Sequence, residues 1–336
     1  MADLNKLICA AIIANTGNGT CCVDFSKIIG IIKVPKGAVI TEANATNLQT
    51  YIQTQIQAAT KTLRWFPMGD FLSLELGGAD ARTFTYGYGR KVTSGYNDYE
   101  FKFETGDCGA CEAWQYQSHN KNSKHYFYLI AEDGTIIGRK YTRPFSSTVA
   151  NPVNVLLPFD GGFEALPIMF TNGTDPNKYA LTVTIPVVQL NYGNVGWITP
   201  ATDAEKSYIV ESMQGLRTIY FVETLLTAGI NAGSHNSHTT TTIDVFPLTG
   251  CDQENIATLL TTLLAITNWS LTNATTGAVI PITSVAITGT APNQQVRVTY
   301  PTQVAGTKLT LSMANPTVLA AAGFSGWDSA PYTWTV

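Results

Sequence analysis

A two-residue alternation of apolar and polar side chains constrains this chain more than any other feature. It is clearest at Tyr99–Glu104, where aromatic side chains fall on one face and charged ones on the other. This period puts every second residue on the same face of a β-strand. The segments around it follow the same rhythm, and Asp133-Gly134 is a strong hairpin signal. Between about residues 70 and 190 the sequence therefore predicts a β-rich unit, with strands at 83–88, 99–104, 125–131, 135–140 and 179–190.

Several segments interrupt this rhythm. At 42–64, Leu48, Ile52, Ile56, Ala59 and Leu63 recur at steps of three and four, which predicts an amphipathic helix with Thr41 as its N-cap. A second, short helix is expected at Cys108–His119. The segment Arg90–Asn97 is interpreted as a charged turn, and the Pro- and Gly-rich segment 145–175 as a long insertion of loop character.

The chain is expected to divide into two domains. Residues 1–228 form the β-rich assembly domain, 229–239 have the Gly, Ser, His and Asn composition of a linker, and 240–336 form a second domain. Short strands recur in the second domain about every dozen residues, at 282–287, 295–300 and 308–313. That rhythm is typical of an immunoglobulin-like β-sandwich. The fold class is thus mainly β, a barrel or sandwich with flanking helices followed by a second sandwich.

Charge excludes some functions. Only 13% of the residues are charged, about half the roughly 25% of an average protein, and the net charge is −4 without a basic block. A protein that reads nucleic-acid sequence needs clustered Lys and Arg for the phosphates. No apolar run reaches the roughly 18 residues of a membrane span, so no membrane partner is expected. The apolar start, Leu7–Ala14, is interpreted as a buried element, and the chain as one made and used in a cytoplasm.

The sharpest candidate for chemistry is Cys108-Gly109-Ala110-Cys111, since a CxxC can hold zinc or act as a redox pair. His119 and His125 follow, but at looser spacing than a zinc finger requires. We therefore predict no metal, with Cys108, Cys111, His119 and His125 as the remaining zinc candidates. The six cysteines are expected to be reduced, and His235 and His238 to lie in a solvated loop. No catalytic motif appears, so neither an enzyme nor a cofactor is expected, and no catalytic or cofactor-binding residue is predicted.

The order of these elements resembles one family. Between residues 83 and 140 the expected order is strand, charged turn, strand, short helix, strand, Asp133-Gly134 turn and strand. This order is similar to that of the tail tube proteins of tailed bacteriophages. The resemblance implies a virion structural protein whose copies form stacked rings, a conduit for DNA, with an immunoglobulin-like domain on the outside. Its partners would be further copies of itself and other virion proteins, and its location the virion, assembled in the host cytoplasm.

Two other functions remain open. A head decoration or fibre protein fits the low charge and the appended sandwich equally well. A cell-surface adhesive or carbohydrate-binding module would use exposed aromatic side chains such as Trp327 and Trp334 to stack on sugars. Both residues are better explained as core residues of the second sandwich.

Overall fold

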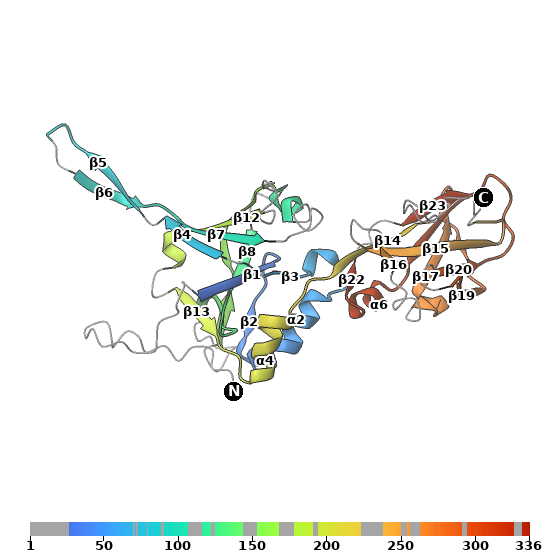
Figure 1. The fold of residues 1–336 in the computed structure, drawn as a ribbon, viewed down its shortest axis with the longest axis horizontal. Coiled ribbons are helices and arrows are strands. Elements are labelled where there is room, and N and C mark those ends of the chain that lie inside the picture. The colour runs from blue at the N-terminus through green and yellow to red at the C-terminus, as the bar shows by residue number, and fades with distance from the viewer. Residues whose placement is uncertain are drawn as a thin grey trace. The chain divides into compact units, whose positions relative to one another are not determined.

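The computed structural model describes two compact units. The residues it describes are 27–69, 71, 73–78, 80–88, 91–106, 116–121, 125–143, 153–167, 178–190, 194–222, 238–249, 254–255, 263–290, 294–325 and 331–336. Unit 1 comprises Met1–Ile56 with Thr60–Gly215, and unit 2 comprises Gln57–Ala59 with Leu216–Val336. Figure 1 shows that both consist mainly of strands. The described pairings are antiparallel except for β14 with β22, and they close no barrel. The mainly β class is therefore confirmed.

The division falls earlier than the expected limit at residue 228. Strand β14 (Arg217–Val222) pairs with β15 (Thr242–Thr249) and therefore belongs to unit 2. The sequence alone places this strand in the expected domain 1–228, because its partner lies beyond the Gly- and Ser-rich segment. Most of the expected linker, 229–239, lies outside the described residues.

Unit 1 is built on one large sheet. Its strand order is β2-β10-β9-β8-β11-β12-β7-β4, with β1 beside β8, β3 beside β1, and β13 beside β9. Because β8 and β9 each have three neighbours, the sheet branches at these two strands. The strands are β1 (Ile28–Val34), β2 (Ile40–Thr41), β3 (Phe66–Met68), β4 (Ser73–Gly78), β7 (Tyr99–Gly106), β8 (His125–Ala131), β9 (Ile136–Arg143), β10 (Val153–Leu157), β11 (Phe159–Ala165), β12 (Lys178–Ile185) and β13 (Val195–Ile198).

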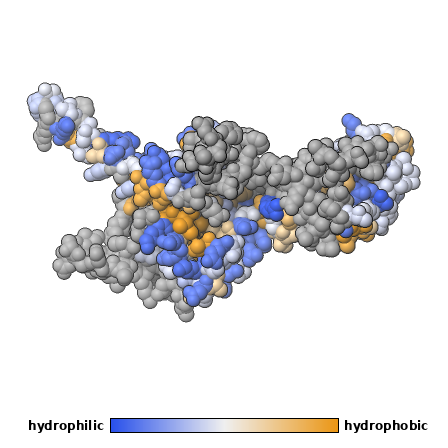
Figure 2. Space-filling view, viewed as in Figure 1, coloured by the Kyte–Doolittle hydropathy of each residue, from blue (hydrophilic) through white to orange (hydrophobic). Residues whose placement is uncertain are grey.

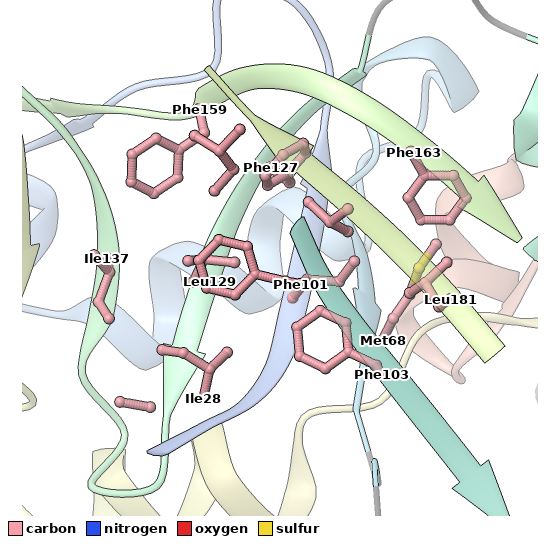
Figure 3. Packing of buried hydrophobic residues seen from close by; sticks show 14 of the residues in the cluster. Ile28, Met68, Phe101, Phe103, Phe127, Leu129, Ile137, Phe159, Phe163 and Leu181 are labelled. Atoms are coloured by element: carbon pink, nitrogen blue, oxygen red, sulfur yellow. The ribbon is translucent and has the colours of Figure 1, made fainter. Parts of the chain in front are cut away.

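The core of unit 1 is rich in phenylalanine (Figure 3). The alternation read from the sequence is confirmed, since Phe101 and Phe103 of β7 are both buried. They pack with side chains from β1, β8, β9, β11 and β12. Figure 3 shows Phe163 at the end of this cluster away from Ile137.

The prediction of a single helix over residues 42–64 is wrong. The structure has α1 (Glu42–Ala45), α2 (Leu48–Ile56) and the one-turn helix η3 (Lys61–Leu63). Thr41 caps α1 as expected, accepting a hydrogen bond from the Asn44 N–H at 3.3 Å. Thr46 ends α1 by donating its hydroxyl to the Ala43 carbonyl, and the Leu48 N–H at the start of α2 donates to the Glu205 carboxylate. Of the expected apolar stripe, Leu48, Ile52 and Ile56 are buried, while Ala59 and Leu63 are exposed.

The long insertion expected at 145–175 is also wrong in part. It contains β10 and β11, two strands inside the main sheet. The glycines that suggest a loop are instead required by close packing. A Cβ atom on Gly161 would meet the Thr184 carbonyl oxygen at 1.9 Å, and one on Gly162 would meet the Thr184 hydroxyl at 2.2 Å. Residues 144–152 and 168–177 lie outside the described part.

Short helical elements complete unit 1. They are a helical turn at 116–118, η4 (His119–Lys121), η5 (Val187–Gln189), α4 (Asp203–Ser207) and the π-helical turn η6 (Tyr208–Ser212). The helix expected at Cys108–His119 is described only from residue 116 onward. The strands predicted at 99–104 and 125–131 and the Asp133-Gly134 turn are confirmed, with Gly134 at a positive φ of 80°.

Unit 2 is a β-sandwich around one core. One sheet has the order β19-β20-β15-β14-β22 with β16 beside β15, and the other has the order β18-β17-β21-β23. Both sheets contribute to a single apolar cluster that includes Val296, Leu311 and Trp334. The remaining elements are β16 (Glu254–Asn255), η8 (Ile266–Asn268), β17 (Trp269–Asn273), β18 (Val279–Ile280), β19 (Ser284–Thr288), β20 (Gln295–Thr299), β21 (Lys308–Met313), α6 (Pro316–Ala321), β22 (Phe324–Ser325) and β23 (Tyr332–Thr335).

Candidate assembly surface

A two-stranded ribbon projects from the large sheet of unit 1 (Figure 1). It consists of β5 (Ala81–Thr85) and β6 (Lys91–Tyr96), which pair with each other and with no other described strand. We call this ribbon the arm. The charged turn expected at Arg90–Asn97 is therefore wrong, because most of it is strand β6. Its Lys, Thr, Ser and Gly residues look like a turn because neither face of the ribbon has a core to face.

Local contacts hold the base of the arm. The Asn97 N–H donates to the Asp80 carbonyl at 2.9 Å, and Arg82 Nε donates to Asn97 Oδ1 at 2.6 Å. The last pair of the sheet below it is Gly78 with Tyr99. A register shift between Arg82 and Thr83 marks a bulge, which twists the ribbon.

Aromatic side chains are exposed along the arm. Tyr88 is 76% exposed and Tyr96 56%, and the rings of Tyr86 and Tyr88 stack on each other at 5.6 Å. An isolated two-stranded hairpin is at best marginally stable in water. Exposed tyrosines also carry apolar area together with a hydroxyl, a combination enriched at protein interfaces. The arm thus has the properties of an element that is completed by contact with another surface.

A hollow lies where the arm leaves the sheet. It has a volume of about 270 Å³ and is lined by Leu76, Gly77, Gly78, Tyr99, Phe101 and Leu190. Leu76 pairs with Phe101 and shares its apolar face, yet Leu76 is 49% exposed. Figure 2 shows apolar atoms gathered on unit 1 near the base of the arm. Here the core face of the sheet extends beyond the layer that covers it.

The outer edge of the sheet is open at the same place. Strand β4 pairs only with β7 among the described strands. Its other edge therefore presents backbone N–H and C=O groups that can pair with an added strand. The arm, the hollow and this edge are adjacent, and together they form one candidate assembly surface.

The zinc candidates are only partly described. Cys108 and Cys111 lie outside the described residues, whereas His119 and His125 both pack against Phe163, with ring centroids at 6.3 and 5.3 Å. The described part of the chain contains no group of three His, Cys, Asp or Glu placed to hold a metal ion. The structure therefore brings the two histidines together, and the prediction about the cysteines stays a prediction.

The other candidate residues lie in unit 2. His238 forms an isolated β-bridge with Ile243, and His235 is not among the described residues. Trp334 is buried in the core of unit 2, as expected, and is not placed to stack on a sugar. Trp327 lies outside the described residues.

Sequence reasoning did not single out Lys33. Its side chain is only 7% exposed, and it lies between Phe66 of β3 and Phe127 of β8 in the register of the sheet. A signal was present, because Lys33 is two residues from Ile31 and in a strand must share its face. An apolar run that contains one lysine at a core-facing position predicts a buried amine.

No family of known proteins matches the chain, and no curated protein matches it. Among the helices described, none is both long and apolar enough to cross a membrane.

Proposed function

We propose that this chain is a self-assembling structural subunit of a virus particle, of the kind that forms the tail tube of a tailed bacteriophage. The observation that carries the proposal is the arm, a ribbon that exposes Tyr86, Tyr88 and Tyr96 beside an open sheet edge. Such a ribbon leaves the unit incomplete as a monomer, and a second copy can complete it.

The remaining features support the same role. Copies would form rings through unit 1, and unit 2 would lie outside as an immunoglobulin-like cover. The rings would stack into a conduit, and a chain with a net charge of −4 would not retain DNA that passes through it. The partners would be further copies and other virion proteins, and no catalytic role is proposed.

The test removes the arm and leaves the sheet intact. Because Gly78 pairs with Tyr99, residues 79–98 can be replaced by Asn-Gly, a two-residue turn that joins β4 to β7. Wild-type protein is expected to form rings or tubes in negative-stain electron micrographs and large species in sedimentation velocity. The arm deletion should remain a folded monomer by circular dichroism and sedimentation.

A matched pair of variants separates the arm from general surface apolarity. Tyr86→Ser combined with Tyr88→Ser should weaken assembly, whereas Tyr141→Ser should not. Tyr141 is comparably exposed, at 48%, but lies on β9. Rings formed by the arm deletion would show that assembly uses another surface. A wild-type protein that stays monomeric under all conditions would contradict the proposed function itself.

A further inference from the structure

The arm continues the hairpin that β4 and β7 begin, and Figure 1 shows it directed away from the sheet. Gly78, the last residue of β4, pairs with Tyr99 of β7. Immediately beyond this pair, the Asn97 N–H donates to the Asp80 carbonyl at 2.9 Å. The arm could reach the free edge of its own β4 only by folding back and breaking this bond. The arm of the same chain is therefore excluded as the partner of that edge.

The free edge of β4 has two chemically different faces. Leu74 and Leu76 lie on the apolar face, because each pairs with a buried phenylalanine of β7. The hollow on this side has a volume of about 270 Å³, and a cavity of about 150 Å³ can hold a benzene ring. The hollow can therefore accept an aromatic side chain. The opposite face carries three carboxylates and one amine, a net charge of −2, from Glu75, Glu100, Glu104 and Lys102.

The arm carries the opposite charge. Residues 81–96 contain three basic side chains and no acid, a net charge of +3, from Arg82, Arg90 and Lys91. Complementary charges of this kind speed the encounter of two partners and fix their register. Each copy of the chain has both the basic arm and the acidic edge, so a second copy supplies the charge that the edge requires.

Strand β6 divides its side chains between two faces, as β4 does. Lys91 and Thr93 share one face, with two threonines of β5 opposite them in the register of the ribbon. Val92 lies between them and therefore falls on the other face, where its side chain is exposed. A strand of this kind that pairs with β4 meets the acidic face with Lys91 and the apolar face with Val92.

We propose that the arm of one copy adds strand β6 to the free edge of β4 in a neighbouring copy. The inference rests on the proposed function, because it names the partner of the same surface. Main-chain hydrogen bonds hold the added strand, Lys91 lies on the acidic side near Glu75, and the exposed tyrosines of the arm cover the hollow. The arm and the edge are different surfaces, so the contact is head-to-tail and its repetition gives a ring or a filament.

Two variants each retain one half of this contact. Replacement of residues 79–98 by Asn-Gly removes the arm and leaves the edge, whereas Leu76→Lys keeps the arm and puts a charge into the hollow. Neither variant should associate alone. Mixed in equal amounts, they should form a discrete heterodimer in sedimentation velocity, because one supplies the edge and the other supplies the arm.

Leu63→Lys is the matched control for Leu76→Lys. Leu63 lies on η3 and is 55% exposed, and Leu76 is 49% exposed. The control introduces the same charge away from the hollow, so it should assemble like wild type. Circular dichroism checks that every variant is folded.

Reversed charges test the acidic face. Lys91→Glu and Glu75→Lys should each weaken association by about tenfold at low salt, because like charges then face each other. A chain with both changes restores the opposite charges between copies and should regain most of the lost association. A double variant that associates no better than the single ones would place Lys91 away from this face and overturn the arrangement.

The remaining outcomes separate this inference from the proposed function. If wild type assembles but the mixed variants stay monomeric, the arm binds elsewhere and the inference is wrong, while the proposed function stands. Assembly of Leu76→Lys alone, equal to that of wild type, would also overturn the inference. Wild-type chains that stop at dimers would indicate a reciprocal exchange of arms instead of a head-to-tail contact. Wild-type chains that never associate would contradict both proposals.

Discussion

Units 1 and 2 differ in how completely each buries its own surface. In unit 2, two sheets enclose one core, and few large apolar side chains among the described residues are exposed, namely Leu264, Ile266, Val279 and Val304. Its buried Asp244 is paired with Arg297 through two hydrogen bonds, at 2.7 and 2.6 Å. Unit 1 instead exposes the arm, leaves Leu76 outside its core and buries Lys33 without a described acceptor. We therefore expect unit 2 to be stable as a monomer, and the proposed assembly to use unit 1.

Separating the two units should have the largest effect on self-association. A fragment of residues 216–336 is expected to unfold cooperatively and to stay monomeric at all concentrations, because its core is enclosed. In sedimentation velocity, association should be retained by a fragment of residues 1–215 and absent from the C-terminal fragment. Association of the C-terminal fragment alone would reverse the roles that we give to the two units.

Truncation of each core should affect one unit only. Phe103 and Leu311 are both fully buried, one in each core. Phe103→Ala should destabilise unit 1 by about 3–5 kcal/mol and Leu311→Ala should destabilise unit 2 by about 2–5 kcal/mol. In differential scanning calorimetry each variant should lower its own transition. Val279→Ala, at a side chain 75% exposed, is the control and should change neither. A single transition that both variants lower equally would show that the two units unfold as one.

The pH dependence of stability that His119 and Lys33 contribute should be a smaller effect, and it should appear in unit 1. The pKa of His119 is about 4 in the folded protein and 6.5 when unfolded, so the unfolded state binds more protons between these values. Stability is therefore lost as pH falls from 6.5 to 4, by at most about 1.4 kcal/mol per pH unit for one proton. Lys33, with a folded pKa of about 8, adds a rise in stability between pH 8 and 10.5.

The matched variants are His119→Phe and Lys33→Met. Each should remove its own part of the pH dependence, measured as the melting temperature of the unit 1 transition. Because Asp and Glu side chains also titrate in the acidic range, the comparison is the difference between wild type and variant. An unchanged acidic slope in His119→Phe would mean that His119 is not held neutral by its surroundings.

The local sequence was sufficient to predict the strands that have one apolar face. Tyr99–Glu104 and His125–Ala131 were predicted as strands because their alternation marks a half-buried surface, and the turn at Gly134 because its dipeptide favours a positive φ. Thr41 was predicted as a cap from its side chain. Of the zinc candidates, the sequence supplied His119 and His125 but not their meeting at Phe163.

Contacts between distant segments decided the strands and buried residues that the local sequence did not predict. The strands β10 and β11 look like a loop because Gly161 and Gly162 make room for Thr184 of a neighbouring strand, a contact absent from the local sequence. The segment Lys91–Tyr96 looks like a turn because, among the described strands, it pairs with β5 alone and no core imposes alternation. Lys33 is buried because β3 and β8 flank it in the sheet and Phe163 of β11 lies against its amine. Side-chain order along the chain thus determined which segments can be strands, and packing between distant segments determined which of their faces are buried.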